Sequence, residues 1–171
     1  MGVFMAMDPK HFRNTLGRFA TGVTVVTVNN GEISRGMTAN AFSSVSLDPP
    51  LILICVDQNA TCLEMIRNSK KFNVNFLSEE QKNISDWFAG KGRDADDQFS
   101  ELDYDMGENK TPVLAGNIGL LECGLFNEVP GGDHSIFIGL VTRALFEEDV
   151  KAPLLYYASA YRKIDLNAQF D

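Results

Sequence analysis

Two long stretches of β-forming residues constrain the fold most. They span residues 117–129 and 134–148, and the four residues between them read PGGD. Proline, glycine and aspartate in this order are a strong turn signal. The two stretches therefore predict a pair of long strands joined by a tight turn.

Several shorter stretches also predict strands. The β-branched run at 22–28 precedes an Asn-Gly turn, and FNVNFL at 72–77 alternates apolar and polar residues. Residues 33–47 continue as strand with bends. The continuous apolar run at 51–56 predicts a strand buried on both faces. The aromatic tail PLLYYASAYRKI predicts one more strand.

Three helices are expected, each with a recognisable beginning. The first runs from about Pro9 to Ala20, with Asp8 as N-cap and Gly22 able to end it. TCLEMIRNS offers Thr61 and Glu64 as a capping box, and SEEQKNISDWFAG offers Ser78 and Gln81. The polar, acidic segment from Lys91 to Lys110, with Asp94, Asp96 and Asp97, predicts a long exposed loop that carries at most a short helix.

The order of these elements favours a mainly β fold. Six or seven strands outnumber the helices, and few strands alternate with helices in a βαβ rhythm. A small antiparallel barrel with peripheral helices fits this order better than a doubly wound sheet. No GxGxxG motif follows a strand, so a dinucleotide site of that kind is not supported. A length of 171 residues predicts a single domain.

Charge and cysteine content narrow the class of protein. The net charge is −8, which argues against nucleic acid as a partner, although a small phosphorylated ligand needs only local donors. The three cysteines form no CxxC pair and match no zinc spacing, so buried reduced thiols and no metal site are expected. The N-terminus lacks the pattern of a signal peptide, and no apolar run could span a bilayer. These features predict a soluble cytoplasmic protein.

Three places could carry chemistry, and each has a structural alternative. Thr38, Asn40, Ser44 and Ser46 could read a flat heteroaromatic ligand, but composition alone favours a polar strand with a bulge. The sequence VDQNATCLE leads from a strand into a helix and could cradle phosphate, or Thr61 could simply cap that helix.

His134 follows the glycine turn directly. It could meet a cofactor edge or donate a proton, or it could be a surface residue of the turn. No nucleophile motif such as GxSxG appears, and no carboxylates pair convincingly for hydrolysis. An apolar core with a few polar groups suits a cofactor that supplies its own chemistry.

Segments along nearly the whole chain resemble the short-chain flavin reductase family, the reductase components of two-component flavin monooxygenases. The resemblance runs in order from about residue 10 to residue 163. Its most specific piece is GMTANAFSSVSLDPPLILICVD at 36–57, and the second is GDH followed by a β-run. The remaining pieces are FRNTLGRFATGVTVVTV, FNVNFLS, WFAG and PLLYY.

The resemblance implies an FMN-binding split β-barrel of Greek-key type and a homodimer. It implies NADH- or NADPH-dependent reduction of FMN or FAD, with hydride passing from nicotinamide C4 to flavin N5. The reduced flavin would go to a partner monooxygenase. A non-enzymatic FMN-binding electron carrier, a flavin-dependent reductase of a ferric chelate or a corrinoid, and a plain structural or interaction barrel are the alternatives.

The same resemblance assigns expected site residues. Those expected to contact or line the flavin are Met37, Thr38, Ala39, Asn40, Ser44, Val45, Ser46, Cys55, Val56, Asp57, Thr61, Cys62 and Phe88. Cys55, Val56 and Asp57, together with Thr61 and Cys62, would approach its ribityl and phosphate end. His134 and Tyr161 would face the nicotinamide side. The chain departs from the family at Ala158-Ser159-Ala160, where two arginines are common, so the choice between NADH and NADPH stays open.

Overall fold

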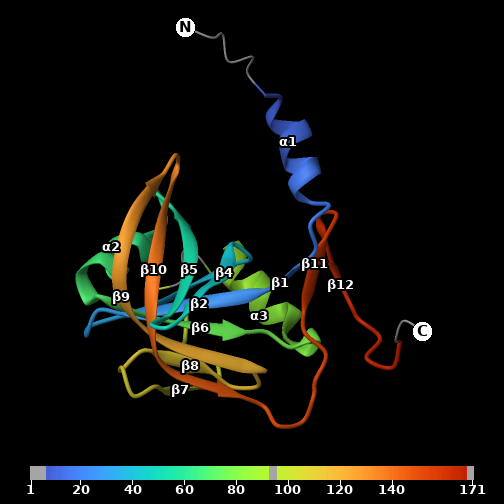
Figure 1. Ribbon diagram of the computed structural model, residues 1–171. Helices are drawn as coiled ribbons and strands as arrows, with labels where there is room; N and C mark the ends of the chain where they lie inside the picture. The colour runs from blue at the N-terminus through green and yellow to red at the C-terminus, as the bar shows by residue number, and fades with distance from the viewer. Residues whose placement is uncertain (1–6, 93–95, 169–171) are drawn as a thin grey trace, which may run out of the picture.

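A seven-stranded antiparallel sheet forms the centre of the molecule in the computed structural model, which describes residues 7–92 and 96–168 (Figure 1). Its strand order is β3-β2-β6-β9-β10-β5-β4. The strands are β2 (Thr24–Asn29), β3 (Ser34–Ala39), β4 (Phe42–Leu47), β5 (Pro50–Asp57), β6 (Lys71–Phe76), β9 (Gly119–Gly131) and β10 (His134–Phe146). The mainly β fold expected from the sequence is confirmed.

The two edge strands of this sheet are consecutive in the sequence. Only Asn40 and Ala41 separate the end of β3 from the start of β4, although five strands lie between them in the sheet. A link of two residues spans roughly 7 Å, so the sheet must curl until its edges approach each other. The Ala41 carbonyl accepts from the Cys55 N–H at 3.1 Å, which fixes the link against β5. This closure makes the sheet a barrel.

The expected long hairpin is present. β9 and β10 each have 13 residues, and Gly131 pairs with His134 across a turn made by Gly132 and Asp133. Gly132 has a φ of +74°, a conformation that favours glycine. The hairpin contains two register shifts, which bend it along the barrel.

β5 corrects the expectation of a strand buried on both faces. Ile52, Ile54 and Val56 are buried, whereas Leu53 and Cys55 are only half-buried. The barrel has one interior, so a strand with solvent on its other side alternates even when its sequence is uniformly apolar.

The helices begin largely where the sequence indicates. α1 (Pro9–Leu16) is shorter than expected and ends before Gly17, not near Gly22, and the Asp8 carboxylate accepts from the N–H groups of Lys10 and His11. The capping box of Ser78 and Gln81 is confirmed. It opens the 3₁₀ helix η1 (Glu79–Gln81), which continues into α3 (Lys82–Asp86) and a wide helical turn, η2 (Trp87–Lys91). α2 (Thr61–Ser69) packs on the barrel core through Leu63 and Ile66.

The C-terminal tail forms two strands where one was expected. β11 (Leu155–Tyr157) and β12 (Ala160–Arg162) pair with each other, and β11 also pairs with β1 (Thr21–Gly22). Ala158 and Ser159 reverse the chain between them with φ values of +49° and +60°. Two successive left-handed residues make the tight turn that suits a two-residue hairpin.

The segment after η2 is held against the molecule more firmly than an exposed loop. Gln98 and Phe99 are buried, and the segment ends in β7 (Tyr104–Met106), which pairs with β8 (Pro112–Leu114). No helix forms between residues 96 and 110. The expected acidic residue Asp94 lies outside the described residues.

A buried carboxylate ties the loop between β7 and β8 to the barrel. Glu122 of β9 is 1% exposed, and it accepts from the backbone N–H groups of Glu108 (3.2 Å) and Asn109 (2.9 Å) and from Arg143 Nη1 (2.9 Å). Burial raises the pKa of Glu122, but these hydrogen bonds and the charge of Arg143 outweigh burial and hold that pKa below its usual range. The carboxylate is therefore charged in the folded protein.

We expect Glu122→Gln to lower the free energy of unfolding at pH 7 by roughly 1–3 kcal/mol, because charged hydrogen bonds are lost in a buried place. A pKa lowered by folding adds stability above the unfolded pKa of about 4.3, and that stability is lost as the pH falls through the folded pKa. Urea denaturation at pH 7 and at pH 3 measures both effects, and Glu122→Gln should weaken the acid dependence. Glu147→Gln, at an exposed carboxylate, is the control; equal losses in both variants would contradict this role.

Candidate functional site

A polar cavity lies where β3, the end of β5 and the start of α2 meet. Its volume is about 330 Å³. The residues that line this polar pocket are Arg35, Gly36, Met37, Asp57, Asn59, Ala60, Thr61, Cys62, Phe88 and Gln98. The structure thus brings together five of the residues expected at the flavin: Met37, Asp57, Thr61, Cys62 and Phe88.

Close packing of Phe88 against β3 forms one wall of the polar pocket. A Cβ atom on Gly36 would lie 2.5 Å from the Phe88 ring, so only glycine allows this approach. The Gly36 N–H donates to Gln98 Oε1 at 2.9 Å, which joins β3 to the segment after η2. The glycine at 36 is therefore required by the shape of the wall.

The first turn of α2 differs from the expected capping box. Ala60 is the N-cap and provides no side-chain cap, Thr61 is the first helical residue, and Glu64 pairs with Arg67 instead. The start of a helix carries partial positive charge and N–H groups that need acceptors. Here that end of α2 lines the polar pocket, beside the guanidinium group of Arg35, whose Nη1 donates to the Asp96 carbonyl at 3.1 Å.

The cysteines do not supply a nucleophile. Burial raises the pKa of Cys62 to about 12, although the positive charge of Arg35 lowers it, and burial raises the pKa of Cys123 to about 12. Cys55 is half-buried, and all three thiols are free. No cluster of three or more potential metal ligands occurs in residues 7–92 and 96–168. Within the same residues, no helix has the length and hydropathy to cross a membrane.

His134 borders the polar pocket through strand pairing. It is the first residue of β10 and lies directly opposite Asp57, the last residue of β5. Side chains of directly paired residues share a face, with Cβ atoms about 4.5–5.5 Å apart. The imidazole Nδ1 lies 2.7 Å from Asp133 Oδ1, and the side chain is 40% exposed. The structure therefore places an accessible imidazole beside a residue that lines the pocket.

Tyr161 lies in a different place. It shares a cavity of about 260 Å³ with Thr38 and Asn40. Its hydroxyl lies 2.8 Å from Ser85 Oγ, and Thr38 Oγ1 donates to the Ser85 carbonyl at 2.6 Å. Tyr161 does not line the polar pocket, and His134 does not line the cavity of Tyr161.

The comparisons with known proteins agree with this geometry. The model of the flavin reductase like domain matches residues 16–165. The chain belongs to this flavin reductase family.

Individual relatives cover most of the chain. The reductase subunit HsaB of a flavin-dependent monooxygenase from Mycobacterium tuberculosis is 34% identical over 160 residues, which are 93% of this chain and 84% of HsaB. The structure of the NADH:FAD oxidoreductase SgcE6 of Streptomyces globisporus, in complex with NAD and FAD fragments, matches with a TM-score of 0.88. It is 38% identical and covers 96% of this chain and 99% of SgcE6. A protein of Rhizobium meliloti described as a probable flavin reductase is 40% identical over 136 residues, which are 79% of this chain but 43% of that protein.

The remaining expected residues of this flavin reductase lie around the link between the edge strands. Asn40 and Cys55 line an apolar groove of about 740 Å³, together with Leu16 and Phe19. Ala39 packs against the barrel core. Val56 is 1% exposed and faces that core, so its side chain points away from the polar pocket.

The edge strand β4 carries the other three residues expected at the flavin. Ser44 and Val45 are exposed, Ser46 is half-buried, and the register shifts between Ser44 and Ser46. The bulge that composition favoured is therefore present at Val45. Its presence is compatible with a ligand-binding role, because bulges re-aim side chains at sheet edges.

Sequence reasoning did not single out Arg35, Asn59 or Gln98. Arg35 immediately precedes the GMTAN motif at 36–40, and this position in the sequence could have indicated a positively charged side chain beside the site. Gln98 offered no signal, because it reaches Gly36 from a segment 62 residues away.

Proposed function

We propose that this chain catalyses the NADH-dependent reduction of FMN or FAD and supplies the reduced flavin to a partner monooxygenase. The observation that carries the proposal is the polar pocket bordered by the Asp57–His134 pair. Membership of the flavin reductase family supports it. SgcE6 is named for NADH, and HsaB for its place in a flavin-dependent monooxygenase, which favours NADH over NADPH and a monooxygenase as recipient.

The residues of the polar pocket fit the phosphate end of a flavin. Arg35 provides a guanidinium group, and the first turn of α2 provides backbone N–H groups at the positive end of the helix dipole. Thr61 adds a hydroxyl to the same wall. Local donors of this kind can hold an anion although the whole chain carries a charge of −8.

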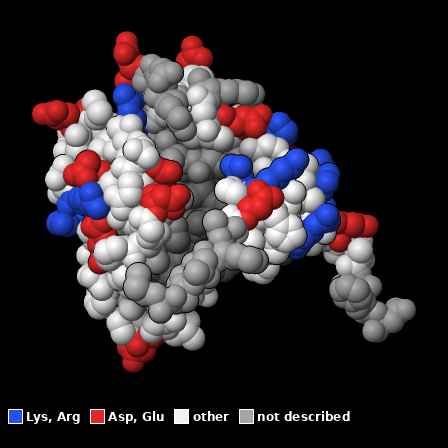
Figure 2. All heavy atoms as spheres, turned by 90° about the horizontal axis from the view of Figure 1, so that it is seen from above, with Lys and Arg blue, Asp and Glu red and all other residues white. Residues whose placement is uncertain are grey.

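The distribution of surface charge agrees with local attraction. Figure 2 shows several Lys and Arg side chains gathered on the side where β11 and β12 lie in Figure 1, while acidic side chains dominate the opposite side of that face. A surface with basic side chains gathered on one side can attract an anionic nucleotide there, although the net charge of the chain is negative.

The ring of the flavin would lie along the link between β3 and β4. Thr38, Ala39 and Asn40 present amide and hydroxyl groups there, and Ser44, Val45 and Ser46 continue along β4. A bound flavin supplies the acceptor of the hydride. The chain would orient the nicotinamide against the flavin, and the polar groups of Thr38 and Asn40 would lie toward the ring edge where negative charge develops. His134 borders the side from which the nicotinamide would approach.

We expect the purified protein to oxidise NADH only when FMN or FAD is added, or when flavin remains bound after purification. The visible spectrum should be recorded first, and NADH and NADPH should be tested with each flavin at 340 nm. Turnover with NADH and flavin supports the proposal. Stoichiometric FMN with no turnover would favour an electron carrier, turnover only with a ferric chelate would favour a different acceptor, and no flavin binding would favour a structural barrel.

Arg35→Met should weaken FMN binding about tenfold or more, because a charged hydrogen-bond donor to the phosphate is lost. Riboflavin lacks the phosphate, so its affinity should change less than twofold. Flavin fluorescence titration measures both dissociation constants. Lys110→Met is the control, since it removes one positive charge from an exposed position between β7 and β8. Equal losses for FMN and riboflavin would assign Arg35 a structural role instead.

We also propose that the chain forms a homodimer through α1 and the apolar groove. None of the residues of α1 is buried, and Phe12, Leu16 and Phe19 are 51%, 57% and 77% exposed. Figure 1 shows α1 projecting from the rest of the molecule. An amphipathic helix with an exposed apolar face and an adjoining apolar groove suits burial by a second copy.

Light scattering after size exclusion should give twice the 18.9 kDa of one chain. Leu16→Asp and Phe19→Asp should each shift the mass toward that of the monomer, because a charge would be buried at the interface. Phe126→Asp is the control, at an exposed aromatic residue on β9. A monomeric wild-type protein would contradict the dimer, and a dimer that persists in both variants would exclude this surface.

A further inference from the structure

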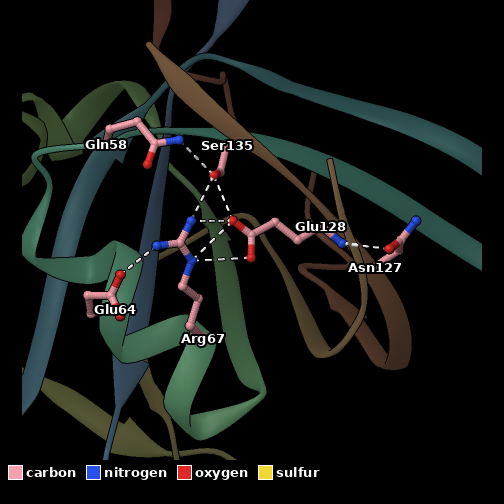
Figure 3. Close-up of polar contacts among 6 residues, drawn as sticks. All are labelled: Gln58, Glu64, Arg67, Asn127, Glu128 and Ser135. Carbon is pink, nitrogen blue, oxygen red and sulfur yellow. Dashed lines mark hydrogen bonds and ion pairs between the residues drawn. The ribbon is translucent and has the colours of Figure 1, made fainter. Parts of the chain in front are cut away.

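Four side chains from four parts of the fold form one hydrogen-bonded network (Figure 3), and one of them, Ser135, follows His134 in the sequence. They are Gln58 after β5, Arg67 in α2, Glu128 in β9 and Ser135 in β10. Ser135 is 1% exposed and lies at the centre. Its hydroxyl donates to Glu128 Oε1 at 2.7 Å and accepts from Gln58 Nε2 at 3.0 Å and from Arg67 Nη2 at 3.3 Å.

Gln58 holds the chain on both sides of His134. Its backbone N–H donates to the carbonyl of Asp133 at 3.0 Å, and its side chain donates to Ser135. Gln58 itself lies between Asp57 and Asn59, which both line the polar pocket. One residue therefore connects the wall of the pocket to the two neighbours of the imidazole.

This connection lies where the strand ladder stops. Asp57 ends β5 and His134 begins β10, so theirs is the last pair between these two strands, and on the other side of β10 the pair of Gly131 and His134 closes the turn. The turn itself consists of Gly132 and Asp133, and glycine restricts the backbone least. Ladder ends are the places where strands open most readily. Contacts beyond these two pairs add to the order of the backbone on either side of the imidazole.

Arg67 and Glu128 anchor the network to the core. Both Nε and Nη2 of Arg67 bond to the Glu128 carboxylate, at distances from 2.6 to 3.2 Å. The Arg67 guanidinium holds the pKa of Glu128 below its usual range, with help from the Ser135 hydroxyl. Arg67 follows the buried Ile66 of α2, so the helix that supplies it is fixed by the barrel interior.

The alternation of side chains along β10 places Ser135 and His134 on opposite faces of the strand. Successive residues point to opposite faces, so Ser135 enters the network on the buried side and His134 projects on the other. The 40% exposure of the imidazole and the burial of Ser135 agree with this arrangement. The network can therefore fix the position of His134 without occupying the space beside it.

We propose that Ser135 and Gln58, supported by the Arg67–Glu128 pair, are positioning residues that hold His134 against the nicotinamide side of the site. The inference rests on the proposed function and adds residues to it. Their effect on the reaction passes through His134. Loss of the hydrogen bonds at Ser135 should therefore affect the use of NADH and leave flavin binding nearly unchanged.

The kinetic test is a double-mutant cycle on the full chain. Ser135→Ala and Gln58→Met should each raise the KM for NADH about fivefold, with less than a twofold change in the flavin dissociation constant. In a His134→Ala background neither substitution should have a further effect on the KM, because coupled residues are not additive. Glu64→Gln is the matched control, since it removes the exposed partner of Arg67 and leaves the network intact.

A second measurement needs no turnover. The chain has two histidines, His11 and His134, so their side-chain NMR signals are easily assigned. Ser135→Ala should shift or broaden the His134 signals and leave those of His11 unchanged. A wild-type protein without NADH-dependent flavin reduction would overturn the proposed function, whereas this measurement would still test the network.

Two outcomes would overturn the positioning role. One is an unchanged His134 spectrum in both Ser135→Ala and Gln58→Met. The other is an additive cycle, in which Ser135→Ala raises the KM equally with and without His134. A general loss of stability would lower the thermal midpoint and weaken flavin binding as well, so melting curves of each variant distinguish it from lost positioning.

Discussion

The two-residue link between β3 and β4 is the constraint on which the rest of the structure depends. Because consecutive strands occupy opposite edges of the sheet, the barrel must close at Asn40 and Ala41. Closure brings the GMTAN strand, the bulged β4 and the end of β5 into one region, although they form one continuous segment of 22 residues, 36–57. The most distinctive motif of the sequence is therefore also the segment at which the barrel closes.

Prediction from the sequence succeeded in most places where local chemistry decides the conformation, and the capping box expected at Thr61 and Glu64 is the exception. The hairpin around Gly132, the Asp8 cap and the Ser78 capping box each follow from residues within a few positions of one another. It failed where distant contacts decide. The run at 51–56 alternates in burial because the barrel has a single interior, and 91–110 is held by Phe99 in a cluster built from other elements.

The residues of the candidate site show the same difference between local sequence motifs and distant contacts. The stretch 36–57 and the start of α2 could be proposed as parts of a site because their motifs are continuous in the sequence, and the structure places Met37, Asp57 and Thr61 around one cavity. Gln98 could not be predicted, because no motif in the segment around it indicates that it contacts Gly36, 62 residues away. The resemblance grouped Tyr161 with His134 on the nicotinamide side, which stays a prediction; within one chain the Tyr161 hydroxyl lies in hydrogen-bond contact with Ser85. Residue type alone does not tell which distant segments meet.

Arg67 shows how an ion pair can serve the geometry of a site more than the stability of a fold. Each of its partners is partly exposed, and ion pairs of that kind add little to the free energy of folding. Their value lies in direction, because a planar guanidinium group fixes the carboxylate that it binds in two places at once. Glu128 in turn accepts from the hydroxyl of Ser135, so the fixed carboxylate also orients the residue that follows His134. In the proposed positioning role, the contacts with α2 add to the strand pairing of His134 with Asp57 and Gly131, so that the imidazole beside a glycine turn is held in a defined place.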